Sequence, residues 1–297
     1  MTYKEIIEVA KDCMGFCKAC IICNGKVCKN SMPGPGAKGI GDVAIRNYDK
    51  WKEIRLNMDT IAENKDVDTS FELFGKKFKY PIFAGPVGAV QLHYGDKYTE
   101  EEYNNIMLKS CNDSGIASFT GDGVNPNVMI AATNMIKKQN GMGIPTVKPW
   151  NIDIIKEKMK LVADSNAFAV AMDIDGAGLP FLKNLTPKAG SKTVEELREI
   201  KKIANRPFII KGIMTAKGAI KARESGADAI IVSNHGGRVL DQCAATAEVL
   251  PEIVDAVGGT IKILVDGGIR SGADILKALG IGADGVVIAR TFVIALY

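Results

Sequence analysis

The stretch ILVDGGIRSGADILKALGIGADGVVIAR, residues 263–290, joins two short apolar runs through one amphipathic segment. The runs ILV and GVVI have the length and character of buried strands, while the segment between them places apolar side chains at helical spacing. A strand, a helix and a second strand in this order indicate a parallel sheet. The stretch therefore predicts two parallel strands joined by a helix that begins at about Gly272.

The same alternation repeats along most of the chain. Eight apolar runs alternate with amphipathic segments, several of which end in Gly as helices do. A doubly wound open sheet shows the same alternation, but eight runs in a chain of 297 residues favour a TIM (β/α)8 barrel. The predicted fold class is therefore α/β, with strands expected within residues 81–88, 116–121, 144–150, 168–176, 207–213, 229–237, 262–268 and 285–290.

The chain divides into two predicted parts. Residues 1–75 lack the alternation and are interpreted as a helix, a cysteine-rich loop, a Gly/Pro-rich loop and a second helix, whereas residues 76–297 form the barrel. The stretch GPGAKG at 34–39 matches a dinucleotide-binding pattern, but no strand precedes it, so we interpret it as a loop. The sequence ends in RTFVIALY, and we expect the last helix to be truncated there.

Composition excludes two classes of partner. The net charge of +4 arises from 38 basic residues scattered among 34 acidic ones, which does not indicate a nucleic-acid surface. No apolar run approaches the roughly 18 residues that a membrane helix needs, and the N-terminus does not resemble a signal peptide. We therefore expect a cytoplasmic protein that binds neither nucleic acid nor membrane.

The stretch SNHGGRVLDQ, residues 233–242, follows the apolar run AIIV. Its His235 and Arg238 are expected at the C-terminal end of a barrel strand, where barrel enzymes build their active sites. Glycine lets a flat ligand approach the backbone, and arginine offers a planar fork to a carboxylate. A lone histidine is more often structural, but this position favours a functional role for His235.

Three further cations are expected at the same end of the barrel. Arg270 and Arg290 follow the last two predicted strands, and with the helix start near Gly272 they predict a phosphate site. Lys211 ends the run PFIIK, where a buried structural lysine is disfavoured because an unpaired buried charge is costly. His93 is expected near the mouth as a structural or rim residue rather than a second base.

Three stretches together, KGIMTAKGA, GADAIIVSNHGGRVLD and DGGIRSGADILKALGIGADGVVIAR, resemble the FMN-dependent α-hydroxy-acid oxidizing enzymes, which include glycolate oxidase and lactate oxidase. The resemblance is highly specific over residues 207–292, fair over 69–175 and weak before that. It implies FMN at the C-terminal mouth of a barrel and oxidation of a small (S)-2-hydroxy acid to the 2-oxo acid, with flavin N5 accepting the electrons. It also implies a homo-oligomer, and it leaves the electron acceptor open.

The resemblance assigns roles by position. His235 is implied to be the base, Arg238 the anchor of the substrate carboxylate, Lys211 a cation beside flavin N1 and O2, and Asp175 the acid that stabilises the imidazolium. The implied FMN contacts are Lys148, Lys211, Ser233, Asp266, Gly268, Arg270, Ala289, Arg290, Gly85 and Thr120.

The sequence departs from the family at several positions. Lys148 and Trp150 stand where the family has a Gln and a Tyr. Asp173 replaces a Thr, and Ala289 replaces a Gly. Leu182, with Lys183 next to it in the sequence, stands at about the position where the family has a second arginine. We expect Lys148 to bring a second cation to the flavin and Trp150 to fill the substrate pocket. These changes predict poor activity on glycolate and lactate and better activity on acids that pack against an indole.

The N-terminal stretch CMGFCKACIICNGKVC contains Cys13, Cys17, Cys20, Cys23 and Cys28. Overlapping C-x-x-C spacings suit a metal site, but no regular second pair follows, so a metal and reduced thiols both stay open. The missing Tyr and Arg keep an alternative function open as well, namely a flavin- or metal-binding barrel with an altered substrate or no turnover.

Overall fold

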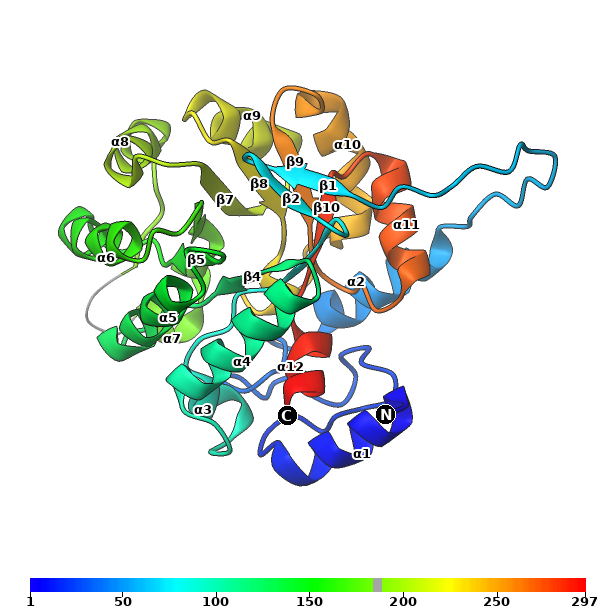
Figure 1. Ribbon diagram of the computed structural model, residues 1–297, viewed down its shortest axis with the longest axis horizontal. Coiled ribbons are helices and arrows are strands. Elements are labelled where there is room, and N and C mark those ends of the chain that lie inside the picture. Colours follow the sequence, from blue (N-terminus) through cyan, green and yellow to red (C-terminus); the bar gives the residue numbers. More distant parts are fainter. Residues whose placement is uncertain (184–188) are drawn as a thin grey trace.

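The computed structural model describes residues 1–183 and 189–297, and its centre is a closed barrel of eight parallel strands (Figure 1). Closure is made by β10 and β3, which pair with Val286 opposite Ile82 and Ile288 opposite Ala84. This pairing confirms the predicted barrel over an open sheet. Each strand lies within one of the eight predicted runs: β3 Ile82–Ala84, β4 Ala117–Thr120, β5 Ile144–Val147, β6 Val170–Asp173, β7 Phe208–Ile213, β8 Ala229–Val232, β9 Lys262–Val265 and β10 Gly285–Ile288.

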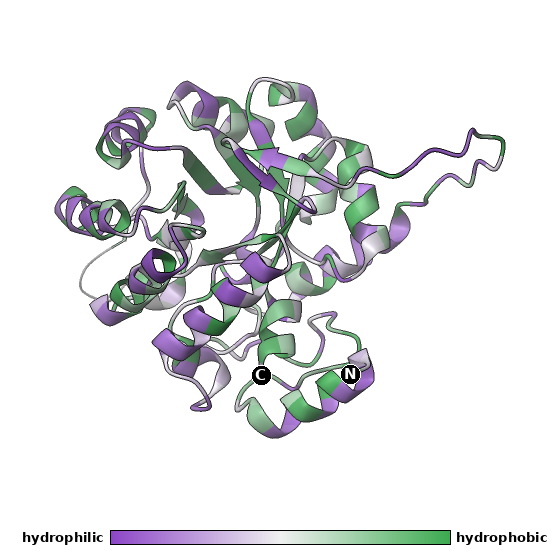
Figure 2. Cartoon of the chain, in the orientation of Figure 1, coloured by the Kyte–Doolittle hydropathy of each residue, from purple (hydrophilic) through white to green (hydrophobic). Residues whose placement is uncertain are grey.

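Helices surround this barrel. Figure 2 shows mostly hydrophobic strands and helices that carry both hydrophilic and hydrophobic residues, as amphipathic covering helices do. Six of them begin after a side chain that caps the first free amides, namely Thr99, Asn125, Asn151, Thr193, Thr215 and Ser271. The helices are α4 Glu100–Asp113, α5 Pro126–Lys138, α6 Ile152–Asp164, α8 Val194–Ala204, α9 Ala216–Glu224, α10 Thr246–Val257, α11 Gly272–Ile281 and α12 Arg290–Leu296.

Short helices follow several strands at their C-terminal ends. They are α3 Val90–Tyr94, α7 Pro180–Lys183 and the 3-10 turns η1 Ile174–Gly178 and η2 His235–Gly237. These turns carry some side chains of the candidate site, such as His93, Asp175 and His235, whereas Thr146, Asp173 and Lys211 lie near the ends of strands that are largely buried on both faces. The barrel thus supplies a rigid base, and function is concentrated in the segments that follow the strands.

A small hairpin closes the end of the barrel at which the strands begin. Its strands β1 Phe71–Leu73 and β2 Lys76–Phe78 pair antiparallel. Leu73 and Phe78 are buried in the same apolar cluster as first residues of barrel strands, and the Phe78 ring meets that of Phe83 edge to face at 5.3 Å. The hairpin therefore leaves the opposite end of the barrel for ligands.

The N-terminal segment packs on the barrel. Its α1 Tyr3–Cys13 lies beside α12 in Figure 1 and shares an apolar cluster with it. The second helix, α2 Asp42–Glu53, buries Trp51 in the main core, where the indole N–H donates to the Gly267 carbonyl at 2.8 Å. Residues 34–39 form a loop, as predicted. The division at residue 75 stays a prediction, and it falls in the turn of the β1–β2 hairpin.

Within residues 1–183 and 189–297, none of the helices combines the length and the apolar character that crossing a membrane would require.

Candidate active site

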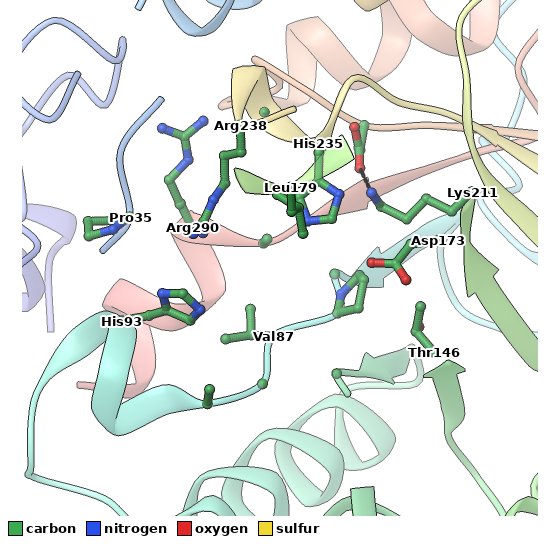
Figure 3. A pocket seen from close by; sticks show the side chains of 18 of the residues that line it. Pro35, Val87, His93, Thr146, Asp173, Leu179, Lys211, His235, Arg238 and Arg290 are labelled. Carbon is green, nitrogen blue, oxygen red and sulfur yellow. Dashed lines mark ion pairs between the residues drawn. The ribbon is translucent and has the colours of Figure 1, made fainter. Parts of the chain in front are cut away.

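A cavity of about 290 Å³ opens at the C-terminal ends of the strands (Figure 3). Most of the site residues predicted from the sequence line it: Gly85, Lys148, Lys211, His235, Arg238, Asp266, Gly268, Arg270, Ala289 and Arg290. Asp175, Ser233 and Thr120 stand outside this lining, and the first two contact residues that belong to it. The strand ends therefore bring together positions that are up to 205 residues apart in the chain, such as Gly85 and Arg290.

His235 and Asp175 form a pair beside the cavity. His235 has φ of 56° and begins η2, and its Nδ1 lies 3.1 Å from Asp175 Oδ1. Burial alone would raise the pKa of Asp175, but Lys211 and His235 hold it at about 2. Burial lowers the pKa of His235, although Asp175 opposes this. The pair is therefore a carboxylate and a neutral imidazole at neutral pH.

The sharp turn after His235 depends on glycine. Gly237 has φ of 83°, and a Cβ built on it would lie 2.8 Å from the backbone nitrogen of Ala44 in α2. The Gly237 carbonyl also accepts a hydrogen bond from the Lys38 amide at 2.9 Å. Only glycine combines this conformation with so close an approach, so the N-terminal segment helps to position η2.

Lys211 is a buried cation with carboxylates around it. Its Nζ lies 3.6 Å from Asp266 Oδ2, which also accepts a hydrogen bond from the Ser233 hydroxyl at 2.9 Å. Burial opposes the charged form, but Asp175 and Asp266 outweigh it and raise the pKa of Lys211. Burial raises the pKa of Asp266. Lys211 is therefore a fixed positive charge in the cavity wall.

Arg238 and His93 meet at the carbonyl of Pro33, a cavity residue that the sequence did not suggest. Arg238 Nη2 donates to this oxygen at 2.9 Å, and His93 Nδ1 contacts it. Arg238 Nε is buried without a partner in the described part of the chain. Burial and the charge of Arg238 lower the pKa of His93 to about 3, so His93 is neutral. His93 lines the cavity, and its interpretation as a structural or rim residue stays a prediction.

Arg270 and Arg290 also line the cavity, and the Arg290 side chain lies beside that of Arg238 (Figure 3). Arg270 Nε donates to the carbonyl of Cys23 at 2.9 Å. The helix start that was expected to offer free amides is capped from within, because Asp274 Oδ2 accepts from the amides of Arg270 and Ser271 at 3.1 Å. These two amides are therefore not available to an anion, and Arg270 and Arg290 are the cations that this part of the cavity offers.

Two expectations about the family departures were wrong. Lys148 lines the cavity, but its Nζ is paired with Asp173 Oδ2 at 2.5 Å, so it adds no net charge. Trp150 is fully buried and lies outside the cavity lining, because its indole N–H donates to the buried Asp122 Oδ2 at 2.7 Å. Asp122 also binds Lys158 Nζ at 2.5 Å and thereby holds this region of the core.

The wall near η1 is apolar. Leu179 and Leu182 are buried and line the cavity together with Val87. The side chain of Lys183, which the sequence placed beside Leu182, lies outside the described residues. Leu179 and Thr146 are cavity residues that sequence reasoning missed, because no motif marks them.

Several buried polar atoms lack partners within residues 1–183 and 189–297. Those that belong to the cavity or to predicted site residues are Thr120 Oγ1, Thr146 Oγ1, Asp173 Oδ1, Asp175 Oδ2, Arg238 Nε and Asp266 Oδ1. Buried polar atoms in native proteins are nearly always paired, and Thr146, Asp173, Arg238 and Asp266 line the cavity. Both donors and acceptors are represented, which fits a polar ligand.

The cysteines of the N-terminal loop are free thiols. In the described part of the chain, the only three ligand-type side chains gathered within 4.8 Å are Asp173, Asp175 and His235. Cys13, Cys17, Cys20, Cys23 and Cys28 do not form such a group, and the question of a metal in their loop stays open.

Comparison with known proteins places this site in a family. The FMN-dependent dehydrogenase family model matches residues 35–121 and 181–297. A 2-hydroxyacid oxidase of Dictyostelium discoideum is 50% identical over 275 residues, which cover 83% of this chain and 70% of that protein. An L-lactate dehydrogenase of Actinobacillus pleuropneumoniae serotype 5b is 41% identical over 303 residues, covering 84% of this chain and 79% of that protein.

Solved structures agree on the fold. The crystal structure of mandelate oxidase with (S)-4-hydroxymandelic acid has a TM-score of 0.77, with 21% identity over 99% of this chain and 86% of that one. With the matched sequence regions and the 50% identical relative, this likeness leads to one conclusion: the chain belongs to the FMN-dependent dehydrogenase family.

Proposed function

We propose that this protein oxidises a small (S)-2-hydroxy acid to the corresponding 2-oxo acid. The observation that carries the proposal is the convergence of His235, Arg238 and Lys211 on one cavity, with Asp175 paired to the histidine. The names of the relatives, a 2-hydroxyacid oxidase and an L-lactate dehydrogenase, support the same chemistry. When bound, FMN supplies an acceptor for two electrons at its N5 atom.

The cavity suits FMN on its own terms. The unpartnered atoms of Thr146, Asp173 and Asp266 supply donor and acceptor positions for a heteroaromatic ring, and Thr120 lies next to the cavity residue Gly121. Arg270 and Arg290 are the residues proposed to hold its phosphate, and Lys211 the residue beside N1 and O2. We assign Gly85, Lys148, Ser233, Gly268 and Ala289 to the same binding site as expected contacts or supports.

His235 is the proposed base. Because Asp175 is a carboxylate, it accepts a hydrogen bond from Nδ1–H of His235, which leaves Nε2 without a proton and able to take one from the substrate. As two electrons leave the substrate carbon, the imidazole becomes an imidazolium, which the negative charge of Asp175 stabilises. The lowered pKa of His235 keeps it ready as a base at neutral pH.

Arg238 and the apolar wall define the proposed substrate. The unpaired Nε of Arg238 is available to a carboxylate, whose geometry matches a guanidinium fork. Leu179, Leu182 and Val87 replace the indole that was expected beside it, so an aliphatic side chain fits better than a charged one. The proposed substrates are therefore short (S)-2-hydroxy acids with aliphatic chains.

An anaerobic reduction experiment tests the proposal. The FMN-loaded protein is mixed with glycolate, which is achiral, with (S)-lactate and longer aliphatic (S)-acids, and with the (R) enantiomers of these chiral acids. Flavin absorbance is followed in each mixture. We expect bleaching by the aliphatic (S)-acids and none by the (R)-acids, which serve as matched controls. If no 2-hydroxy acid bleaches the flavin, the protein is instead a flavin-binding barrel without this turnover.

A further inference from the structure

The thiol of Cys23 contacts both arginines at the proposed phosphate end of the cavity. Arg270 and Arg290 each donate a side-chain hydrogen bond to it, and the Cys23 carbonyl accepts a further bond from Arg270 Nε at 2.9 Å. The ion pairs formed within the described ranges include neither arginine, whereas Lys148 and Lys211 each have a carboxylate. Within the described residues, the titratable group in hydrogen-bonding contact with both guanidiniums is therefore the Cys23 thiol.

Cys23 differs in this respect from its neighbours. Burial would raise the pKa of Cys23, but Arg290 and Arg270 hold it below its ordinary value. Burial raises the pKa of Cys17 to about 11 and also raises that of Cys20. Tyr3 of α1 and Tyr94 of α3 also interact electrostatically with this thiol. Among these loop thiols, Cys23 is thus the one with two cations directly against it.

The N–H donors of Arg270 and Arg290 cannot form a full set of hydrogen bonds with two anions at once. A thiolate and a phosphate both seek N–H donors, and a phosphate dianion beside a thiolate repels it. We propose that Cys23 is a modification site. In the flavin-free chain its thiolate accepts hydrogen bonds from Arg270 and Arg290, and it loses these hydrogen bonds when a flavin phosphate binds to the two arginines. This rests on the proposed function, which assigns the phosphate to those arginines.

The thiolate, rather than the thiol, reacts with soft electrophiles. In alkylation by iodoacetamide, the sulfur forms a bond to carbon and iodide leaves with the electron pair of the carbon–iodine bond. The flavin-free chain should therefore react at Cys23, and the loaded chain should not. Modification would in turn remove the negative charge and place a bulky group between the arginines, which would hinder loading of the cofactor.

Alkylation rates at each cysteine, measured by mass spectrometry, test this assignment. The flavin-free protein is treated with iodoacetamide at pH 7.5 alone, with FMN, with inorganic phosphate and with riboflavin, which lacks the phosphate. We expect Cys23 to react several-fold faster than Cys20, because the thiolate is the reactive form and the pKa of Cys23 is lowered while that of Cys20 is raised. FMN and phosphate should slow Cys23 about 10-fold, and riboflavin should change its rate by less than about 2-fold. Cys243, whose pKa is raised by burial, is the internal control and should not respond.

A pair of variants gives a second readout. Cys23→Ser removes the competing thiolate and should bind FMN about 3- to 10-fold more tightly at pH 8, whereas the matched Cys20→Ser should bind as the unaltered protein does. Affinity is measured by quenching of flavin fluorescence. If Cys23→Ser does not fold, the alkylation rates still decide.

The two proposals fail in different ways. If quenching of flavin fluorescence shows that FMN binds but the alkylation rate of Cys23 is unchanged, the inference about Cys23 is overturned and the proposed function stands. The same holds if riboflavin slows the alkylation of Cys23 as much as FMN does. If FMN does not bind at all, the proposed function itself fails.

Discussion

Lys148→Gln should destabilise the fold far more than the loss of a surface ion pair does. The Lys148 and Asp173 side chains retain only 12% and 3% of their exposure, and Asp173 Oδ1 already lacks a partner in the described structure. Removing one partner of a buried pair typically costs about 3–5 kcal/mol, because it leaves an uncompensated charge. Lys211 also interacts with Asp173, so we expect the lower end of that range, about 3 kcal/mol.

The double variant Lys148→Gln with Asp173→Thr should recover most of this loss. Replacing both partners of a buried pair is often nearly neutral, so the double variant should lie within about 1 kcal/mol of the unaltered protein. The free energy of unfolding is measured on the flavin-free protein in urea by circular dichroism. Lys109→Gln, in an exposed pair with Asp113, is the matched control and should cost less than about 1 kcal/mol. If the single variant costs as little as this control, or the double variant is no more stable than the single one, Lys148 and Asp173 do not compensate each other.

Three further variants probe the site. His235→Asn should retain its flavin but lower the rate of anaerobic bleaching by at least about 100-fold, since it removes the proposed base; a near-normal rate would mean that another group takes the proton. Arg238→Lys should raise KM about 10-fold or more with flavin content unchanged, because lysine keeps the charge but loses the fork; an unchanged KM in steady-state assays would place the carboxylate elsewhere. His93→Gln should reduce the loss in the free energy of unfolding that occurs as the pH falls from 7 to 5. With a pKa of about 3 when folded and about 6.5 when unfolded, His93 is protonated first in the unfolded chain as pH falls below 6.5, which costs about 2 kcal/mol by pH 5. Urea unfolding from pH 7 to 5 should show a steeper loss in the unaltered protein than in the variant, and parallel curves would contradict the burial of a neutral His93.

The barrel was predictable because each strand is buried on both faces. Such strands are continuous apolar runs, so their positions could be identified one by one without knowing their partners. His235 and Arg238, which follow β8, and Lys211, in the second half of β7, could be assigned to one cavity because parallel strands of a barrel end at the same face.

The errors concern residues beyond a strand end. Lys148 and Trp150 would share a face if β5 continued, but it ends at Val147. The chain turns at Pro149, and Asp122 binds the indole in the core. The pairing of Lys148 with Asp173 could not be predicted either, because it joins the residue after β5 to the last residue of β6. Pro33 was missed because the resemblance is weak in the N-terminal segment, and nothing in its local sequence indicates a contact with Arg238.

The pairing of β3 with β10 constrains the order in which the barrel can fold. Val286 lies opposite Ile82, so the contact that closes the barrel spans 204 residues of chain. Contacts this distant in sequence carry a large loop-closure entropy and slow folding. During synthesis the edge of β3 has no partner on one side until residues 285–288 have left the ribosome, and an unpaired edge strand is a template for association with other chains. The nascent chain therefore cannot close its barrel until β10 has emerged, and its aggregation hazard should be greatest just before that strand is added.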